Sequence, residues 1–344
     1  MRTFSRSNFF FLSLGLFLLF LIPTVCWFLF APPSKTSSTK VVFIKKGTSL
    51  KKASEILQEE GVIKNKNFFV LLATVLGKKT KVRAGEYEFN TQMLPLEILE
   101  SLVRGQAKRH LVTIPEGYTL SQIAQLLEDL NLVERKSFLQ KASSPAFIST
   151  LGLSPSETPT LEGYLFPDTY HLFREMDPEE VIQVMMNQFK KVFGPDLANR
   201  ASELGISPRE AVILASIIEK ETSLPEEKSL ISSVFHNRLR KKIPLQSDPT
   251  VIYGIRNFNG NLTKEDLMRP TPYNTYLISG LPPTPICSPG KDSLLAAVHP
   301  APVPYLYFVS KNDGSHFFSS DFEEHNRAVW KYQKDSKKNG LTKR

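Results

Sequence analysis

The chain is poor in cysteine, with two in 344 residues, Cys26 and Cys287. Cys26 lies in an uncharged apolar run and Cys287 stands alone in the rest of the chain, so no internal disulfide is expected and the redox compartment stays undecided. The six histidines show neither H-x₃-H spacing nor an H-E-x-x-H pattern, which argues against a zinc site. G-x-S-x-G, P-loop and G-x-G-x-x-G motifs are also missing, so hydrolase-elbow, nucleoside triphosphatase and dinucleotide functions lack support. We expect neither a metal nor another cofactor.

An excess of positive charge is also missing from the middle of the chain, although the net charge is +9. Residues 35–110 carry 15 Lys and Arg against 7 acidic residues, whereas residues 111–330 carry 20 against 26. A net acidic middle argues against a nucleic-acid site on the main domain. The basic segment before it suits a stalk close to anionic lipid headgroups, or is simply a solvated lysine surface.

The longest uncharged run is Phe9 to Ala31, 23 residues in which Pro23 predicts a kink. This length exceeds the roughly 20 residues that cross a bilayer core. A cleaved signal peptide has a shorter apolar core and a small-x-small site, but here Pro32 and Pro33 follow Ala31. We therefore expect an uncleaved single-pass anchor. More lysines follow this run than arginines precede it, so the positive-inside rule alone would place the body of the protein in the cytoplasm. Long domains, however, translocate largely regardless of charge, and we therefore expect the body outside the cytoplasm.

A repeat follows the anchor. Residues 42–50 (VFIKKGTSL) and 112–120 (VTIPEGYTL) match at their valine, glycine and helix-capping positions, and each is followed by an amphipathic pattern. Each unit predicts a strand, a glycine turn and a helix capped by Ser or Thr. The pattern resembles LysM-type modules, which bind amino-sugar polymers, although a glycine turn before a capped helix is common.

A third feature is a glutamate inside an apolar helix. Ser207, Pro208 and Glu210 form a helix start with a capping box, and a helix from Pro208 to about Thr222 follows. Its apolar residues cover nearly the whole circumference, which predicts burial. Glu219 and Glu221 lie about 200° apart on this helix, so they cannot form one catalytic pair. Burial raises the pKa of a glutamate, as a general acid near neutral pH requires. The alternatives are that Glu219 caps the helix end or pairs with an arginine such as Arg238, or that Ser216 and Lys220 form a dyad.

The C-terminal part is rich in proline-stiffened loops that carry polar and aromatic side chains. This mixture suits a sugar groove, in which hydroxyls need fixed polar partners and sugar rings stack on aromatic faces. A rigid loop-rich surface without a ligand would have the same composition. The segments are LEGYLFPDTY (161–170), LASIIEKET (214–222), VFHNRLR (234–240), LQSDPTVIYG (245–254), YNTY (273–276), GLPPTPICSPG (280–290) and HPAPVPYLYFV (299–309).

In this order and behind one anchor, these segments closely resemble the bacterial endolytic murein transglycosylase (YceG-like) family, from the anchor to about Trp330. The resemblance implies that Glu219, the first glutamate of the EKET motif, is the catalytic one. It implies cleavage of the β-1,4 bond between N-acetylmuramic acid and N-acetylglucosamine, with the muramyl C6 hydroxyl as nucleophile, to leave a 1,6-anhydro end. One carboxyl group can serve as acid and then as base. The loop at 280–290 departs from the family, because Thr284, Pro285 and Cys287 replace smaller residues.

Asp248 is the nearest candidate for the second carboxylate that an ordinary glycosidase uses. We assign it instead to binding the glycan or orienting its neighbours, and the expected substrate-binding set is Gln246, Asp248, Tyr253, Tyr273, Asn274 and Tyr276. Three functions stay open at this point: an anchored enzyme that cuts nascent glycan strands and terminates their elongation, a non-enzymatic wall-binding assembly factor, and a hydrolytic muramidase.

The expected fold class is α+β. The expected partners are peptidoglycan strands, the inner (cytoplasmic) membrane through residues 9–31, and peptidoglycan synthases of the penicillin-binding class with the elongation or division machinery, but no nucleic acid. The expected parts of the chain are a cytoplasmic head (1–8), a transmembrane anchor (9–31), a first LysM-like module (40–108), a second LysM-like module (109–158), a catalytic α+β domain (159–335) and a basic tail (336–344).

Overall fold

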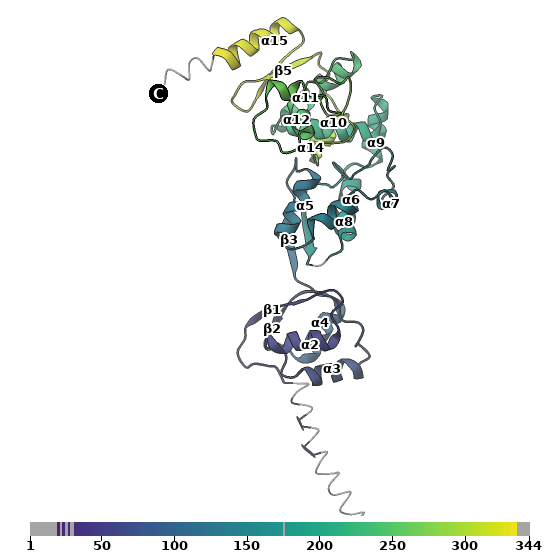
Figure 1. Cartoon of the computed structure of the whole chain (residues 1–344), viewed down its shortest axis with the longest axis vertical. Helices are drawn as coiled ribbons and strands as arrows, with labels where there is room; N and C mark the ends of the chain where they lie inside the picture. Colours follow the sequence, from purple (N-terminus) through teal and green to yellow (C-terminus); the bar gives the residue numbers. More distant parts are fainter. Residues whose placement is uncertain (1–18, 21–22, 25–26, 28–30, 175, 336–344) are drawn as a thin grey trace, which may run out of the picture. The chain divides into compact units, whose positions relative to one another are not determined.

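The computed structural model describes residues 31–174 and 176–335, together with Leu19, Phe20, Pro23, Thr24 and Trp27. The predicted cytoplasmic head, the basic tail and most of the predicted anchor lie outside these residues. None of the helices in the described part is both long enough and apolar enough to cross a membrane. The chain divides into two compact units, one of residues 1–111 with 171–176 and the other of residues 112–170 with 177–344 (Figure 1).

The first unit contains the first copy of the repeat. Its elements are β1 (Thr39–Ile44), α2 (Leu50–Glu59), α3 (Lys66–Val75), β2 (Gly85–Asn90) and α4 (Pro95–Arg104). The strands pair antiparallel, with Thr39 opposite Asn90 and Ile44 opposite Gly85. Alternate residues of both strands pack with the apolar faces of the helices in one core that includes Val42, Leu57 and Phe89. The predicted strand, turn and capped helix are therefore present, and a second helix and strand complete a β-α-α-β order.

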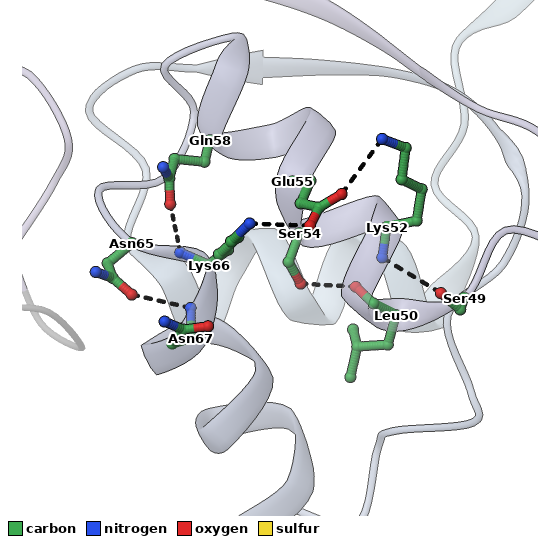
Figure 2. Close-up of polar contacts among 9 residues, drawn as sticks. All are labelled: Ser49, Leu50, Lys52, Ser54, Glu55, Gln58, Asn65, Lys66 and Asn67. Atoms are coloured by element: carbon green, nitrogen blue, oxygen red, sulfur yellow. Dashed lines mark hydrogen bonds and ion pairs between the residues drawn. The ribbon is translucent and has the colours of Figure 1, made fainter.

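Side-chain caps fix the starts of α2 and α3 in this unit (Figure 2). The Ser49 hydroxyl accepts a hydrogen bond from the backbone N–H of Lys52, and the Asn65 side chain accepts one from Asn67. Glu55 joins the two helices, because its carboxylate binds Lys52 on its own helix and Lys66 on the next. Each cap satisfies a backbone donor that a helix leaves unpaired at its first turn.

The second copy of the repeat has the same order, with one additional short helix before its second strand. It consists of β3 (Arg109–Thr113), α5 (Leu120–Asp129), α6 (Arg135–Ala142), the short α7 (Pro145–Thr150) and β4 (Thr169–Phe173), with β3 paired to β4. Thr119 and Gln122 form a capping box at the start of α5. The closing strand β4 lies beyond residue 158, where we expected the second module to end.

Helices dominate the remainder of the second unit. They are α8 (Pro178–Val192), α9 (Pro195–Glu203), α10 (Pro208–Glu221), α11 (Pro225–Arg240), α12 (Asp248–Gly254), α13 (Lys264–Leu267) and α14 (Lys291–Val298), followed by the β5 (Tyr307–Ser310) and β6 (His316–Ser319) hairpin, α15 (Phe322–Val329) and a π-helical turn (Trp330–Asp335).

The central helix is α10, which packs against α9, α11, α12 and α14 (Figure 1). Its N-terminal capping box of Ser207 and Glu210 is present, and its residues from Ala211 to Ile218 are all buried. The prediction of a helix buried on every side is thus confirmed. Helices together with small antiparallel sheets confirm the α+β class.

Candidate active site

Glu219 lies in the last turn of α10, with its side chain 8% exposed. One of its oxygens, Oε2, accepts three hydrogen bonds: 2.6 Å from the Ser293 hydroxyl, 3.0 Å from the Gly290 N–H and 3.2 Å from the Lys228 ammonium group. The Lys228 side chain is only 5% exposed. A buried carboxylate is stable only with a counter-charge and donors, and this site provides both.

The other carboxyl oxygen of Glu219, Oε1, receives no hydrogen bond from any of the described residues. The group is therefore anchored through one oxygen and open to a proton at the other. General acid–base catalysis requires this geometry, because the reacting proton needs an oxygen that the protein does not already use.

Glu219 is therefore not paired with Arg238, as one alternative held. The Arg238 guanidinium instead donates to the backbone carbonyls of Leu306, Pro244 and Leu245. The Ser–Lys dyad is also wrong. The Ser216 hydroxyl donates to the Ile213 carbonyl, while Lys220 donates to the Gly117 carbonyl at 3.3 Å.

The glycine turn of the second repeat forms one wall beside Glu219. Gly117 has a φ of +75°, and a Cβ at this position would lie 3.8 Å from Cγ of Glu219. The backbones of Gly117 and Tyr118 exchange hydrogen bonds of 2.9 and 2.8 Å with Ser288. The second repeat, the end of α10 and the loop with Ser288 thus meet at one place.

Glu221 has a separate environment, as the helix geometry predicts. The Ser247 hydroxyl donates to its carboxylate, and burial, together with the charge of Asp248, raises the pKa of Glu221 to about 7. The raised pKa expected for a buried glutamate of this helix is thus found here. Burial is the main cause, because the charged form loses its hydration.

Three of the predicted substrate-binding residues meet near Glu221. Tyr276 donates a 2.6 Å hydrogen bond to Asp248, whose charge acts on Glu221. Arg238 donates to the Gln246 side chain at 3.2 Å, while the Gln246 backbone N–H donates to the Thr275 carbonyl at 3.0 Å. The start of α12 and the YNTY segment therefore form one polar cluster.

The remaining three lie around a tyrosine pair. The rings of Tyr253 and Tyr273 pack edge to face, with centroids 4.9 Å apart. Asn274 is fully buried, and its amide donates to the carbonyls of Leu267 and Arg269. Its carbonyl oxygen accepts from the Tyr276 N–H, so every polar part of this side chain holds the loop.

Glu162, which no sequence pattern had indicated, lies in the LEGYLFPDTY segment and is 4% exposed. Its carboxylate accepts hydrogen bonds of 2.9 Å from both the Leu120 N–H and the Tyr253 hydroxyl. Burial nevertheless raises the pKa of Glu162 to about 7. Lys228, Ser293 and Gly290 were not predicted from the sequence either, because none of the three stands in a pattern that indicates catalysis.

The loop at 280–290 packs against α10. Cys287 is buried, with its Sγ 3.3 Å from the Ser216 carbonyl oxygen, and burial raises the pKa of its thiol well above the ordinary value. Such a thiol stays protonated and inert, so Cys287 is a packing residue.

A cavity of about 320 Å³ is lined in part by Lys228 and Asp292, beside Glu219. A larger one, of about 1020 Å³, lies at the opposite end of α10, near Pro208 and Arg209. The smaller cavity is the one next to Glu219, because Lys228 contacts Glu219 directly. Within the described residues, no group of three or more His, Cys, Asp or Glu side chains could hold a metal ion.

The fold and site define an α+β protein with a buried glutamate, Glu219, in the last turn of its central helix and paired with a lysine. The sequence profile of the YceG-like family matches residues 42–331, and the chain belongs to this family. It is 34% identical over 319 residues to the endolytic murein transglycosylase of Bacillus subtilis (strain 168), covering 88% of both chains.

Two further relatives agree with this assignment. The chain is 30% identical over 331 residues to the endolytic murein transglycosylase of Streptococcus pneumoniae serotype 2, covering 86% of this chain and 59% of that protein. A crystal structure of a putative YceG-like protein from Listeria monocytogenes matches with a TM-score of 0.59 and 31% identity, over 84% of this chain and 98% of that one.

Proposed function

We propose that this protein is a lytic transglycosylase that cleaves peptidoglycan inside its glycan strands. It acts on the β-1,4 bond between N-acetylmuramic acid and N-acetylglucosamine and leaves 1,6-anhydro ends. The observation that carries the proposal is the Glu219 carboxyl group, with Oε2 held by three donors and Oε1 left open. The names of the relatives support the choice of substrate.

The reaction begins with Glu219 protonated on Oε1. It gives this proton to the leaving oxygen of the N-acetylglucosamine unit as the glycosidic bond breaks. The muramyl C6 hydroxyl attacks the anomeric carbon and loses its own proton to a carboxylate, a role that the newly ionised Glu219 can fill. Lys228, Ser293 and the Gly290 N–H stabilise the negative charge that appears on Glu219 after the first transfer.

We assign glycan binding to the polar cluster of Gln246, Asp248 and Tyr276 and to the Tyr253–Tyr273 pair. Tyrosine faces stack on sugar rings, and carboxylate and amide groups bind sugar hydroxyls. Asn274 supports this region through the loop backbone, since its amide already binds two carbonyls.

We further propose that residues 9–31 anchor the protein in the cytoplasmic membrane with its body outside the cytoplasm. The length of this uncharged run supports the anchor. The β-α-α-β order of both repeats supports LysM-like modules. An enzyme tethered there meets nascent strands, so cleavage would end glycan elongation, and peptidoglycan synthases and the elongation or division machinery would be its partners.

Mass spectrometry of the muropeptides released from purified peptidoglycan tests the function. The wild-type chain should release anhydromuramyl products, and Glu219→Gln should lower their rate by at least about 100-fold, because general acid catalysis contributes about 10² to 10⁴. Glu210→Gln is the matched control on the same helix, since glutamine also completes a capping box.

Three results would contradict the proposal. Reducing ends from the wild-type chain would indicate a muramidase and direct attention to Asp248. Glycan binding without any product would favour a wall-binding factor. Full activity of Glu219→Gln would remove this residue from the mechanism.

A further inference from the structure

A second carboxyl group lies beside Glu219, on the loop between β3 and α5. A Cβ placed on Gly290 would fall 2.0 Å from one carboxyl oxygen of Glu116 and 2.5 Å from the other, so the carboxyl group lies directly against this glycine. The N–H of the same glycine donates to Glu219. Gly290 therefore has one carboxyl group packed on its Cα and another bound to its nitrogen.

The surroundings of the two carboxyl groups differ. The Glu219 side chain is buried and bound by three donors, whereas Glu116 is exposed. None of the hydrogen bonds or ion pairs among the described residues involves the Glu116 carboxyl group. The Glu116 carboxyl group thus makes no hydrogen bond or ion pair that a ligand would have to displace, and it lies on the same glycine as Glu219.

Charges of both signs surround this pair. Glu219 on α10, Asp292 on α14 and the Lys228 ammonium group on α11 act on Glu116. A second ammonium group, that of Lys220, lies 3.3 Å from the carbonyl oxygen of the next residue, Gly117. Although the residue as a whole is exposed, partial burial of its carboxyl group, followed by the charge of Glu219, raises the pKa of Glu116; Lys228 opposes the shift and Asp292 adds to it. The raised pKa makes the Glu116 carboxylate a better proton acceptor than that of a free glutamate.

We propose that Glu116 is a second catalytic residue, the base that receives the proton of the attacking muramyl C6 hydroxyl. This rests on the function proposed above and divides its two proton transfers between two residues. Glu219 gives its proton to the leaving oxygen, the C6 oxygen bonds to the anomeric carbon, and the C6 hydroxyl proton moves to Glu116. The proton then passes from Glu116 to Glu219, which restores the starting state without any co-reactant.

The test compares Glu116→Gln, Glu116→Asp and the exposed control Glu226→Gln with the wild-type full-length chain. The readouts are kcat and KM across pH and the ratio of anhydro to reducing ends. We expect Glu116→Gln to lower kcat by about 100-fold with KM changed less than about threefold, because the lost interaction acts in the transition state. In the wild-type chain kcat should fall at low pH as the base becomes protonated, and this fall should be absent in Glu116→Gln. The share of reducing ends should increase, because water replaces a C6 hydroxyl that has lost its base.

Glu116→Asp keeps the carboxylate and should recover part of kcat and the acid limb. Gly290→Ala gives an independent test, because its Cβ displaces the Glu116 carboxyl group and leaves the N–H bond to Glu219 in place. It should lower kcat in the same way. Equal melting temperatures would show that every variant folds.

The inference fails if Glu116→Gln keeps the wild-type kcat and pH profile, if it changes KM alone, or if Glu226→Gln has the same effect. A wild-type chain that releases no anhydro product instead refutes the proposed function itself, and with it this role of Glu116. The wild-type products thus test the function, and the variants test the second residue.

Discussion

Replacing Glu162 by glutamine should make the second unit less sensitive to alkaline pH. The wild-type carboxyl group is buried, and its pKa is raised from 4.5 to about 7. Between these pH values the folded state holds a proton that the unfolded state has lost. Stability therefore falls as pH rises through this window.

The size of the effect follows from the shift. One pKa unit corresponds to about 1.4 kcal/mol, so the full shift of Glu162 corresponds to about 3 kcal/mol, with about 2.5 kcal/mol of it lost between pH 5 and 8. Glutamine does not ionise. Its amide oxygen can accept the Leu120 N–H and its amide nitrogen can donate to Tyr253, so both contacts can persist.

Hydrogen exchange of peptides from α5 and α12 measures the effect, because Glu162 binds one residue of each helix. The exchange rates, corrected for the intrinsic rate at each pH, give the free energy of opening of these helices. The value for Glu162→Gln relative to the wild-type value should increase by about 2.5 kcal/mol between pH 5 and pH 8. Glu157→Gln, an exposed change in the preceding loop, should show no such rise. The reasoning is refuted if Glu162→Gln and wild type change in parallel.

Two further substitutions test the loops around the site by thermal unfolding. Asn274→Ala leaves the carbonyls of Leu267 and Arg269 without their donor and should cost about 1–3 kcal/mol, whereas an unchanged melting temperature would mean that the loop does not need this side chain. Gly163→Ala should cost about 1–3 kcal/mol, because φ there is +83° and the new Cβ would lie 2.3 Å from the Cβ of Pro285; a stabilised protein would contradict this.

The local rules of helix formation explain which parts of this fold were predictable. The capping box of Ser207 and Glu210 and the all-round apolar pattern that follows defined α10 closely, because these signals act between neighbours in the chain. The repeat likewise indicated a strand and a capped helix in each copy. The angular separation of Glu219 and Glu221 followed from helix geometry alone, and the structure gives them different partners.

Composition was less informative about polar side chains. Asn274 and Tyr276 lie two residues apart in the YNTY segment, and both were expected to bind substrate. The Asn274 side chain instead serves the backbone of its own loop, whereas the Tyr276 hydroxyl binds Asp248. A sequence records which hydrogen-bonding groups exist but not whether a backbone carbonyl or a ligand will use them.

The sequence by itself determined the central helix, its glutamate, the two repeats and the family. Only the tertiary structure decided what surrounds that glutamate. Gly290 and Ser293 are more than 70 residues away along the chain, and the loop with Glu116 and Gly117 is about 100 residues before it. Contacts over such separations form when helices pack and loops meet, so no local pattern indicates Glu116 as a neighbour. Lys228 is only nine residues from Glu219 in the chain, but it lies on the next helix, α11, so the packing of α11 against α10 decides that it is the counter-charge.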